Sequence, residues 1–185
     1  MAVPSGDGGG GSAAGASCGV TCHNVVVISG YVNPIHAGHV EYARLAYELA
    51  NGGTVVFIVN NDAQVLLKRG SLFVPELDRL AVVAALRWVH CAVLSTDADR
   101  TVCSTLRRLC IEGVRCHDGV YRTPTHFANG GDVTAKTACP EAAVCAEHGV
   151  ALVYGLGPKV QSSSWILSKQ GRTSTAPSSL PLSTA

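Results

Sequence analysis

The amino-acid sequence predicts an α/β fold: a Rossmann-like, doubly wound, mostly parallel sheet with helices on both of its faces. Short apolar runs typical of buried strands alternate along the chain with longer stretches of helical periodicity. A strand, a helix and a second strand in this order form a parallel pair, because the helix crosses over between the strands. At 185 residues the chain suffices for one such domain. We therefore expect a single folded domain over residues 23–170.

Two segments of biased composition flank the expected domain. Residues 1–22 are dominated by Gly, Ala and Ser, and residues 171–185 by Ser, Thr, Pro and Leu. Such compositions favour flexible chain, because they offer little apolar surface to bury. We therefore expect a flexible arm before the domain and a flexible tail after it.

The first βαβ unit is the clearest part of the pattern. An apolar run from Val25 to Ile28 leads through a turn into a helical pattern from His39 to Ala50. Gly52-Gly53 stops that helix before a second apolar run from Thr54 to Val59. One helix face should pack on the sheet, because four apolar residues recur at i, i+3, i+4 and i+7, namely Tyr42, Leu45, Ala46 and Leu49. The charged residues Glu41, Arg44 and Glu48 should face elsewhere.

The remaining elements are weaker but keep the alternation. Pro75 precedes a helical stretch, and further helices and strands are expected over residues 76–88 (helix), 92–95 (strand), 101–109 (helix), 141–148 (helix) and 150–154 (strand). The stretch from Cys110 to Phe127 has no convincing period. We expect it to be a long loop, and loops of that length are often functional.

Charge and composition exclude several classes of function. The net charge is +1, and no block of Lys or Arg forms the basic patch of a nucleic-acid binder. No apolar run approaches the length of a membrane span, so no membrane partner is expected. The 8 cysteines form no CxxC pair or regular framework, which favours reduced thiols in a cytoplasmic protein. The chain also starts without the basic and apolar regions of a secretory signal.

The residues with the clearest chemistry follow the first strand. His36 and His39, separated by Ala37-Gly38, lie where the helix should begin. Backbone amides at a helix start attract phosphate oxygens, and two imidazoles would add donors there. Gly38 allows a close approach of a ligand, and Asn33-Pro34 favours a tight turn. Late in the chain, Ser162-Ser163-Ser164 precedes an apolar run; serines in that place cap a helix and can also hold phosphate.

Together these motifs resemble the cytidylyltransferase-like nucleotidyltransferase superfamily. The resemblance covers about residues 24–168 and rests on Gly30 to His39, with His-x-Gly-His after the first strand, and on the serines of 162–164. Weaker matches occur in the same order, at residues 59–62, 68–70, 78–79 and 129–132. Among subfamilies, the chain is most similar to single-domain enzymes that act on glycerol phosphate or sugar phosphates, and Asn33-Pro34 also resembles the nicotinamide mononucleotide adenylyltransferases.

The resemblance implies a reaction and a role for each matching residue. A phosphate oxygen of a small phosphorylated acceptor would attack the α-phosphorus of CTP or ATP, with Mg²⁺ accompanying the nucleoside triphosphate and pyrophosphate leaving. His36, His39 and Lys68 would be catalytic. The implied nucleotide-binding residues are Ser29, Gly30, Tyr31, Asn33, Gly38, Arg79, Gln161, Ser162, Ser163 and Ser164. Contacts to acceptor or nucleoside are implied for Asn60, Asp62, Asn129, Gly131 and Asp132. No protein metal site is implied.

Two departures from the family pattern leave alternatives open. Relatives often carry an aromatic residue and an acid where this chain has Val32-Asn33, and a basic-Thr pair where it has Val160-Gln161. A nucleotide-binding protein without turnover is therefore one alternative, because fold alone does not establish function. A metal or redox module would use Cys18, Cys22, His23, Cys116 and His117, but their spacing suits no common zinc site. Arg79 in an amphipathic helix also fits a solvated face, and a domain this rich in apolar residues can form a homodimer.

Overall fold

A computed structural model describes residues 23–116, 118–130, 139–157 and 166. It contains a five-stranded sheet in the order β3-β2-β1-β6-β7, and every neighbouring pair is parallel. The sheet strands are β1 (Val25–Gly30), β2 (Thr54–Val59), β3 (Cys91–Leu94), β6 (His126–Gly130) and β7 (Ala151–Leu156). The helices are α1 (Ala37–Ala50), α2 (Asp62–Arg69), α3 (Glu76–Ala84), α4 (Cys103–Glu112) and α5 (Ala142–His148). The predicted α/β fold is confirmed.

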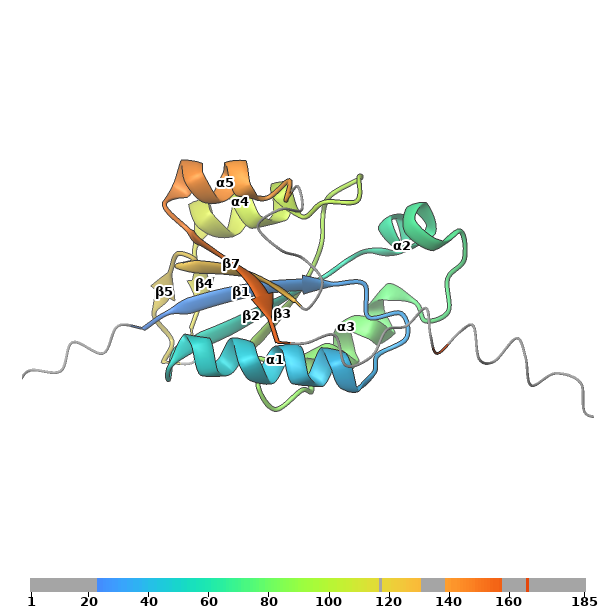
Figure 1. Ribbon diagram of the computed structural model, residues 1–185, viewed down its shortest axis with the longest axis horizontal. Coiled ribbons are helices and arrows are strands. Elements are labelled where there is room, and N and C mark those ends of the chain that lie inside the picture. The colour runs from blue at the N-terminus through green and yellow to red at the C-terminus, as the bar shows by residue number, and fades with distance from the viewer. Residues whose placement is uncertain (1–22, 117, 131–138, 158–165, 167–185) are drawn as a thin grey trace, which may run out of the picture.

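Alternate residues of the central strand β1 enter two hydrophobic cores. Val25 and Val27 pack with residues of α4 and α5, whereas Val26 and Ile28 pack with residues of α1 and α3. Figure 1 shows these two helix pairs on opposite sides of the sheet. Because both faces are covered, β1 and β2 read as continuous apolar runs instead of alternating ones.

The strand order creates a switch point beside β1. The chain passes from β1 through β2 to β3 on one side, and then returns to place β6 on the other side of β1. Neighbouring strands β1 and β6 therefore lead out to opposite faces, and ligands of open α/β sheets bind at the carboxyl ends of such strands. The carboxyl end of β1 carries the turn with the two histidines, and α2 lies beyond that end of the sheet in Figure 1.

The prediction of a long loop from Cys110 to Phe127 is wrong. Helix α4 continues to Glu112, and an antiparallel pair follows, made of β4 (Val114–Arg115) and β5 (Tyr121–Arg122). Phe127 already belongs to β6, where it is paired with Val27. Strands β4 and β5 have two residues each, too few to show a period in the sequence. Strand β6 ends in Asn129-Gly130, a pair that is typical of turns and not of strands.

Helix α1 packs on the sheet through small residues at its centre. Ala43, Ala46 and Ala50 are fully buried, and Tyr42 and Leu49 pack against the same core. Leu45 lies at the rim, where a Cβ on Gly157 would come within 2.2 Å of its Cδ1 atom. The outer face carries Arg44, which pairs with Glu41 at 2.7 Å and also with Glu48.

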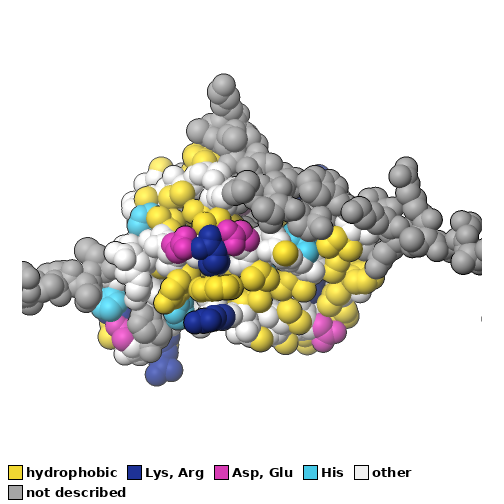
Figure 2. All heavy atoms as spheres, turned by 60° about the horizontal axis from the view of Figure 1, so that its bottom comes forward, with side chains coloured by type: hydrophobic (Ala, Val, Ile, Leu, Met, Phe, Trp, Pro, Cys, Tyr) yellow, Lys and Arg dark blue, Asp and Glu magenta, His cyan; other side chains and the backbone are white. Residues whose placement is uncertain are grey.

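Exposed apolar side chains lie beside charged ones on the face formed by α1 and α3 (Figure 2). They include Tyr47, Leu77 and Val82. A homodimer through such a surface remains a prediction. None of the helices in the described part of the chain combines the length and the apolar character that a membrane crossing needs.

Candidate functional site

The turn between β1 and α1 has a strained backbone. Val32 has φ of 50° and is 1% exposed, and left-handed backbone is rare for a β-branched residue. Packing in the core on the α1 side holds it there. Such strain persists only where the surroundings enforce it, and it concentrates at functional sites.

His36 and His39 cap the start of α1 reciprocally. His36 is the N-cap residue, and its Nδ1 atom accepts a hydrogen bond from the amide of Gly38 at 3.1 Å. The amide of His36 in turn donates to Nδ1 of His39 at 3.3 Å. The two ring centres lie 3.8 Å apart. The cap therefore brings the two predicted catalytic histidines together and fixes the orientation of both rings.

This cap also decides which ring nitrogens carry protons. Each Nδ1 atom accepts, so in a neutral ring the proton lies on Nε2, where it can donate to a ligand. Burial lowers the pKa of His39 to about 3, and the charges of His36 and Arg69 act in the same direction. Burial, with the charge of Arg69, also lowers the pKa of His36. At neutral pH the site thus presents two uncharged Nε2–H donors.

Arg69 is the residue that sequence reasoning missed here. It is the last residue of α2, and its charge acts on the pKa of both His36 and His39. The sequence signal was present in Lys68-Arg69-Gly70, but only Lys68 was singled out. The end of α2 therefore brings a cation close enough to the histidines to lower the pKa of both rings.

Lys68 reaches the β1–α1 turn through Tyr31. The Nζ atom of Lys68 lies 3.9 Å from the centre of the Tyr31 ring. Tyr31 and Lys68, both predicted site residues, are therefore neighbours, although α2 was not expected from the sequence.

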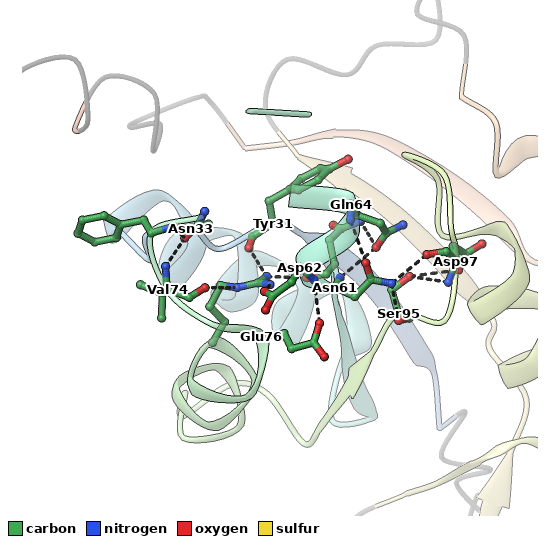
Figure 3. Close-up of polar contacts among 12 residues, drawn as sticks. Tyr31, Asn33, Asn61, Asp62, Gln64, Val74, Glu76, Ser95 and Asp97 are labelled. Carbon is green, nitrogen blue, oxygen red and sulfur yellow. Dashed lines mark hydrogen bonds and ion pairs between the residues drawn. The ribbon is translucent and has the colours of Figure 1, made fainter. Parts of the chain in front are cut away.

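A polar network holds α2 in this place (Figure 3). Asn61 caps α2 and donates through Nδ2 to the carbonyls of Ser95 at 3.1 Å and Asp97 at 2.9 Å. Gln64 donates to the carbonyls of Asp99 and Thr101. Because these acceptors lie after β3, α2 is tied to the carboxyl end of a neighbouring strand.

Arg79 does not lie on a solvated face; that interpretation is wrong. Its side chain is 1% exposed and donates to the carbonyls of Tyr31 at 2.8 Å, Val74 at 2.9 Å and Asn60 at 2.5 Å. It also pairs with Asp62 at 2.6 Å. Arg79 thus joins the ends of β1 and β2 to the start of α2.

Asn33 and Asn60 also bind groups of the protein, but the buried Nδ2 atom of Asn33 has no hydrogen-bond partner among the described residues. Asn33 is fully buried, and its Oδ1 atom accepts from the amides of Phe73 at 3.2 Å and Val74 at 2.8 Å. Asn60 donates to Gln64 at 3.0 Å. The structure therefore gives both side chains a part in shaping the loops around the site.

The carboxyl ends of β1 and β6 are joined by Tyr42. Its hydroxyl donates to the carbonyl of Ala128, and burial raises its pKa, which a backbone hydrogen bond from Ser29 opposes only in part. A Cβ on Gly130 would lie 3.3 Å from the Tyr42 ring, and one on Gly30 would lie 3.2 Å from the Phe57 ring. Both glycines end their strands and leave room for these aromatic rings.

Asn129, near the end of β6, is held by residues that precede α5 and α4. Its Nδ2 atom donates to Sγ of Cys139 at 3.4 Å, and Cys139 donates to Glu141 at 3.3 Å. Glu141 also accepts from the amide of Val102 at 3.0 Å. Asn129 is therefore connected to the start of α4 through a short polar chain.

Several predicted residues lie outside the described part of the chain. They are Gly131, Asp132, Gln161, Ser162, Ser163 and Ser164. Among the described residues, no three His, Cys, Asp or Glu side chains form a group that could hold a metal ion.

No protein-family model matches the chain. It is 37% identical over 75 residues to the FAD synthase of Pyrococcus horikoshii, a match that covers 40% of this chain and 49% of that protein. The chain thus spans about half the length of this relative.

The fold has a match among solved structures. The crystal structure of the lipopolysaccharide core biosynthesis protein from Thermoplasma volcanium superimposes with a TM-score of 0.51 and 21% identity, over 71% of this chain and 94% of that one. It shows the same fold. The similarity to a FAD synthase, together with this fold, confirms the resemblance to the cytidylyltransferase-like nucleotidyltransferase superfamily.

Proposed function

We propose that the protein is a nucleotidyltransferase. It transfers CMP or AMP from CTP or ATP to a small phosphorylated acceptor and releases pyrophosphate. The observation that carries this proposal is the reciprocal cap of His36 and His39, which presents two Nε2–H donors at the carboxyl end of β1. The similarity to a FAD synthase supports it.

The reaction is an in-line displacement. A phosphate oxygen of the acceptor forms a bond to the α-phosphorus, while the bond from that phosphorus to the oxygen bridging to the β-phosphate breaks. Negative charge then develops on the leaving pyrophosphate. Donors that are already oriented stabilise this charge without a cost of reorganisation. His36 and His39 are oriented in this way by the cap, because neither ring can turn without breaking a hydrogen bond to the backbone.

The cations and loops around the histidines receive the remaining roles. Lys68 and Arg69 neutralise charge on the phosphates from the end of α2. Arg79 acts as a positioning residue, because its hydrogen bonds fix the carbonyls of Tyr31 and Asn60. Ser29, Gly38 and the serines of 162–164 contribute to triphosphate binding, and Asp62, Asn129 and Asp132 to the acceptor or nucleoside; these roles follow from the resemblance.

Mg²⁺ is proposed to arrive with the nucleoside triphosphate. Magnesium in such sites is bound by substrate phosphates and water with few protein ligands. The carboxylate of Asp62 already forms an ion pair with Arg79. The carboxylate of Glu141 already accepts hydrogen bonds from Val102 and Cys139. They therefore offer no ready-made cage, and the metal would add charge neutralisation on the phosphates.

The test measures pyrophosphate release with Mg²⁺, pairing ATP and CTP in turn with a panel of acceptors. The panel contains glycerol 3-phosphate, phosphocholine, phosphoethanolamine, sugar 1-phosphates, nicotinamide mononucleotide and FMN. FMN is included because FAD is AMP joined to FMN, which is the bond that the name of the relative implies. Release that depends on one acceptor identifies both substrates.

Two variants connect this activity to the site. His36→Asn keeps a side chain that caps helices well but lacks Nε2, and should lower kcat by about 100-fold, the effect of losing one preorganised donor. The matched control is His148→Asn, at the end of α5 and before β7, away from the carboxyl ends of the strands. Equal turnover of His36→Asn and wild type contradicts the assigned role. Silence over the whole panel, with a melting temperature still raised by a triphosphate, favours the non-catalytic nucleotide-binding alternative.

A further inference from the structure

Three contacts form a closed circuit beside the β1–α1 turn of the candidate site. The ammonium of Lys68 lies over the ring of Tyr31, 3.9 Å from its centre. The hydroxyl of Tyr31 donates to the carbonyl of Arg100 at 3.2 Å. The guanidinium of Arg100 donates to the carbonyl of Leu67 at 2.7 Å, next to Lys68 in the chain. The circuit links the β1–α1 turn, the last turn of α2 and the loop between β3 and α4.

Tyr31 is the rigid member of this circuit. Its carbonyl accepts a hydrogen bond from Arg79 at 2.8 Å. Arg79 is itself buried and is held by Asn60 and Asp62. The ring itself is only partly buried, and Figure 3 shows it pointing away from Asp62. Tyr31 therefore offers a fixed aromatic surface on the same turn that carries His36.

Lys68 needs such a surface. Its side chain is exposed, and a lysine has four rotatable bonds whose freedom is costly to restrict when a substrate binds. An aromatic face attracts an ammonium group through the ring quadrupole. The ring of Tyr31 thus limits Lys68 to positions beside the β1–α1 turn, before any ligand arrives.

Charged groups of both signs act on the hydroxyl of Tyr31. Burial raises the pKa of the Tyr31 hydroxyl, Arg100 and Arg69 act to lower it, and Glu141 and Asp99 act to raise it. The hydroxyl therefore remains protonated at neutral pH and keeps its role as a donor to Arg100. The ring stays neutral, as a cation–π contact with Lys68 requires.

We propose that Tyr31 is a positioning residue that holds the ammonium of Lys68 beside the β1–α1 turn, with Arg100 anchoring Tyr31 to α2. This inference rests on the proposed function, because Lys68 acts there on the phosphates. The competing role for Tyr31 is a stacking platform for the nucleotide base, which would require Lys68 to leave the ring.

The contact can be tested without any activity. Lysines are dimethylated with ¹³C-formaldehyde and a borane reductant, and the methyl signal of Lys68 is assigned by its loss in Lys68→Arg. The ring current of Tyr31 should shift this signal upfield in the wild type and in Tyr31→Phe, but not in Tyr31→Leu. A signal of Lys68 at the same position in wild type and Tyr31→Leu contradicts the contact.

Kinetics then test the positioning role. Tyr31→Leu should lower kcat about fivefold, the rate equivalent of one cation–π contact at an exposed site, with little change in KM for the triphosphate. Tyr31→Phe should restore most of that loss. In a Lys68→Met background, Tyr31→Leu should have no further effect, because the group that it positions is gone. Tyr121→Leu, a tyrosine 66% exposed in β5, is the matched control.

Each contrary outcome has a distinct meaning. A higher KM for the triphosphate in Tyr31→Leu, in both backgrounds, shows base stacking and overturns the proposal. A fivefold loss that persists in Lys68→Met shows a purely structural role and overturns it too. Arg100→Met should lower kcat as well, and Arg108→Met, at an exposed arginine of α4, is its control. A wild-type chain that releases no pyrophosphate contradicts the proposed function, whereas the methyl signal still decides the contact.

Discussion

The backbone amide of His36 donates a hydrogen bond to the ring of His39, and the ring of His36 closes the same cap on Gly38. The two candidate catalytic side chains are therefore also the structural start of α1. This double use separates stability from activity in a measurable way. His36→Ala should lower the free energy of unfolding by about 1 kcal/mol, the usual cost of losing an N-cap. His36→Asn should cost only a few tenths, since Asn is a good N-cap residue. Urea denaturation of both variants measures this difference, and equal losses of stability contradict the capping role.

The pH dependence of stability should report the neutral state of His39. Its pKa is about 3 in the folded chain, whereas the unfolded chain should have the ordinary histidine value of 6.5. Above pH 6.5 the ring is neutral in both states. Between pH 6.5 and 3 the ring of His39 is protonated in the unfolded chain but neutral in the folded chain. The free energy of unfolding therefore falls as the pH falls.

His39→Gln removes this titration and keeps the cap, because Gln at the third helical position accepts the same hydrogen bond. The free energy of unfolding, measured in urea from about pH 7.5 to about pH 4.5, should therefore fall less steeply in His39→Gln than in the wild type. Parallel pH profiles for the two proteins contradict the depressed pKa.

Arg79 should be the most costly polar side chain to remove. Its guanidinium binds three backbone carbonyls and the carboxylate of Asp62, all from segments that frame the site. Arg79→Met leaves the buried carbonyl of Asn60 and three partly buried acceptors without this partner, and should destabilise the fold by about 3 kcal/mol. Arg87→Met, at an arginine beyond the end of α3, is the control and should stay within about 0.5 kcal/mol of the wild type. If urea denaturation shows that Arg79→Met loses as little stability as Arg87→Met, the structural role of the Arg79 hydrogen bonds is contradicted.

Sequence patterns predicted the parts of this fold that depend on local periodicity. The apolar runs of β1 and β2 and the stripe of α1 reflect continuous burial, which each segment records in its own residues. Helix α2 was missed because Leu66 and Leu67 are exposed, so its apolar pattern does not mark a buried face. Its position depends on Asn61 and Gln64, whose partners lie more than thirty residues away.

The candidate site divides in the same way. The histidine motif was visible because strand, turn and helix start are adjacent in sequence. The sequence leaves open whether Arg79 binds nucleotide or lies on a solvated face, because a helix position alone does not reveal the four acceptors that surround its side chain. The contact of Lys68 with Tyr31 likewise depends on the placement of α2, which no local signal predicts.

The two glycines between α1 and β2 should respond differently to the same substitution. A Cβ on Gly53 would lie 2.0 Å from the carbonyl oxygen of Asn24, a backbone atom at the start of β1 that cannot move without disturbing the sheet. A Cβ on Gly52 meets nothing within 4 Å, and only its φ of +82° opposes a side chain. Gly52→Ala should therefore cost about 1 kcal/mol, whereas Gly53→Ala should cost clearly more, because the amide of Thr54 donates to that same Asn24 carbonyl at 2.8 Å. Thermal and urea unfolding of the pair measures this order. A Gly53→Ala variant as stable as Gly52→Ala contradicts the close approach of the α1–β2 turn to β1, and with it the position of α1 along the sheet.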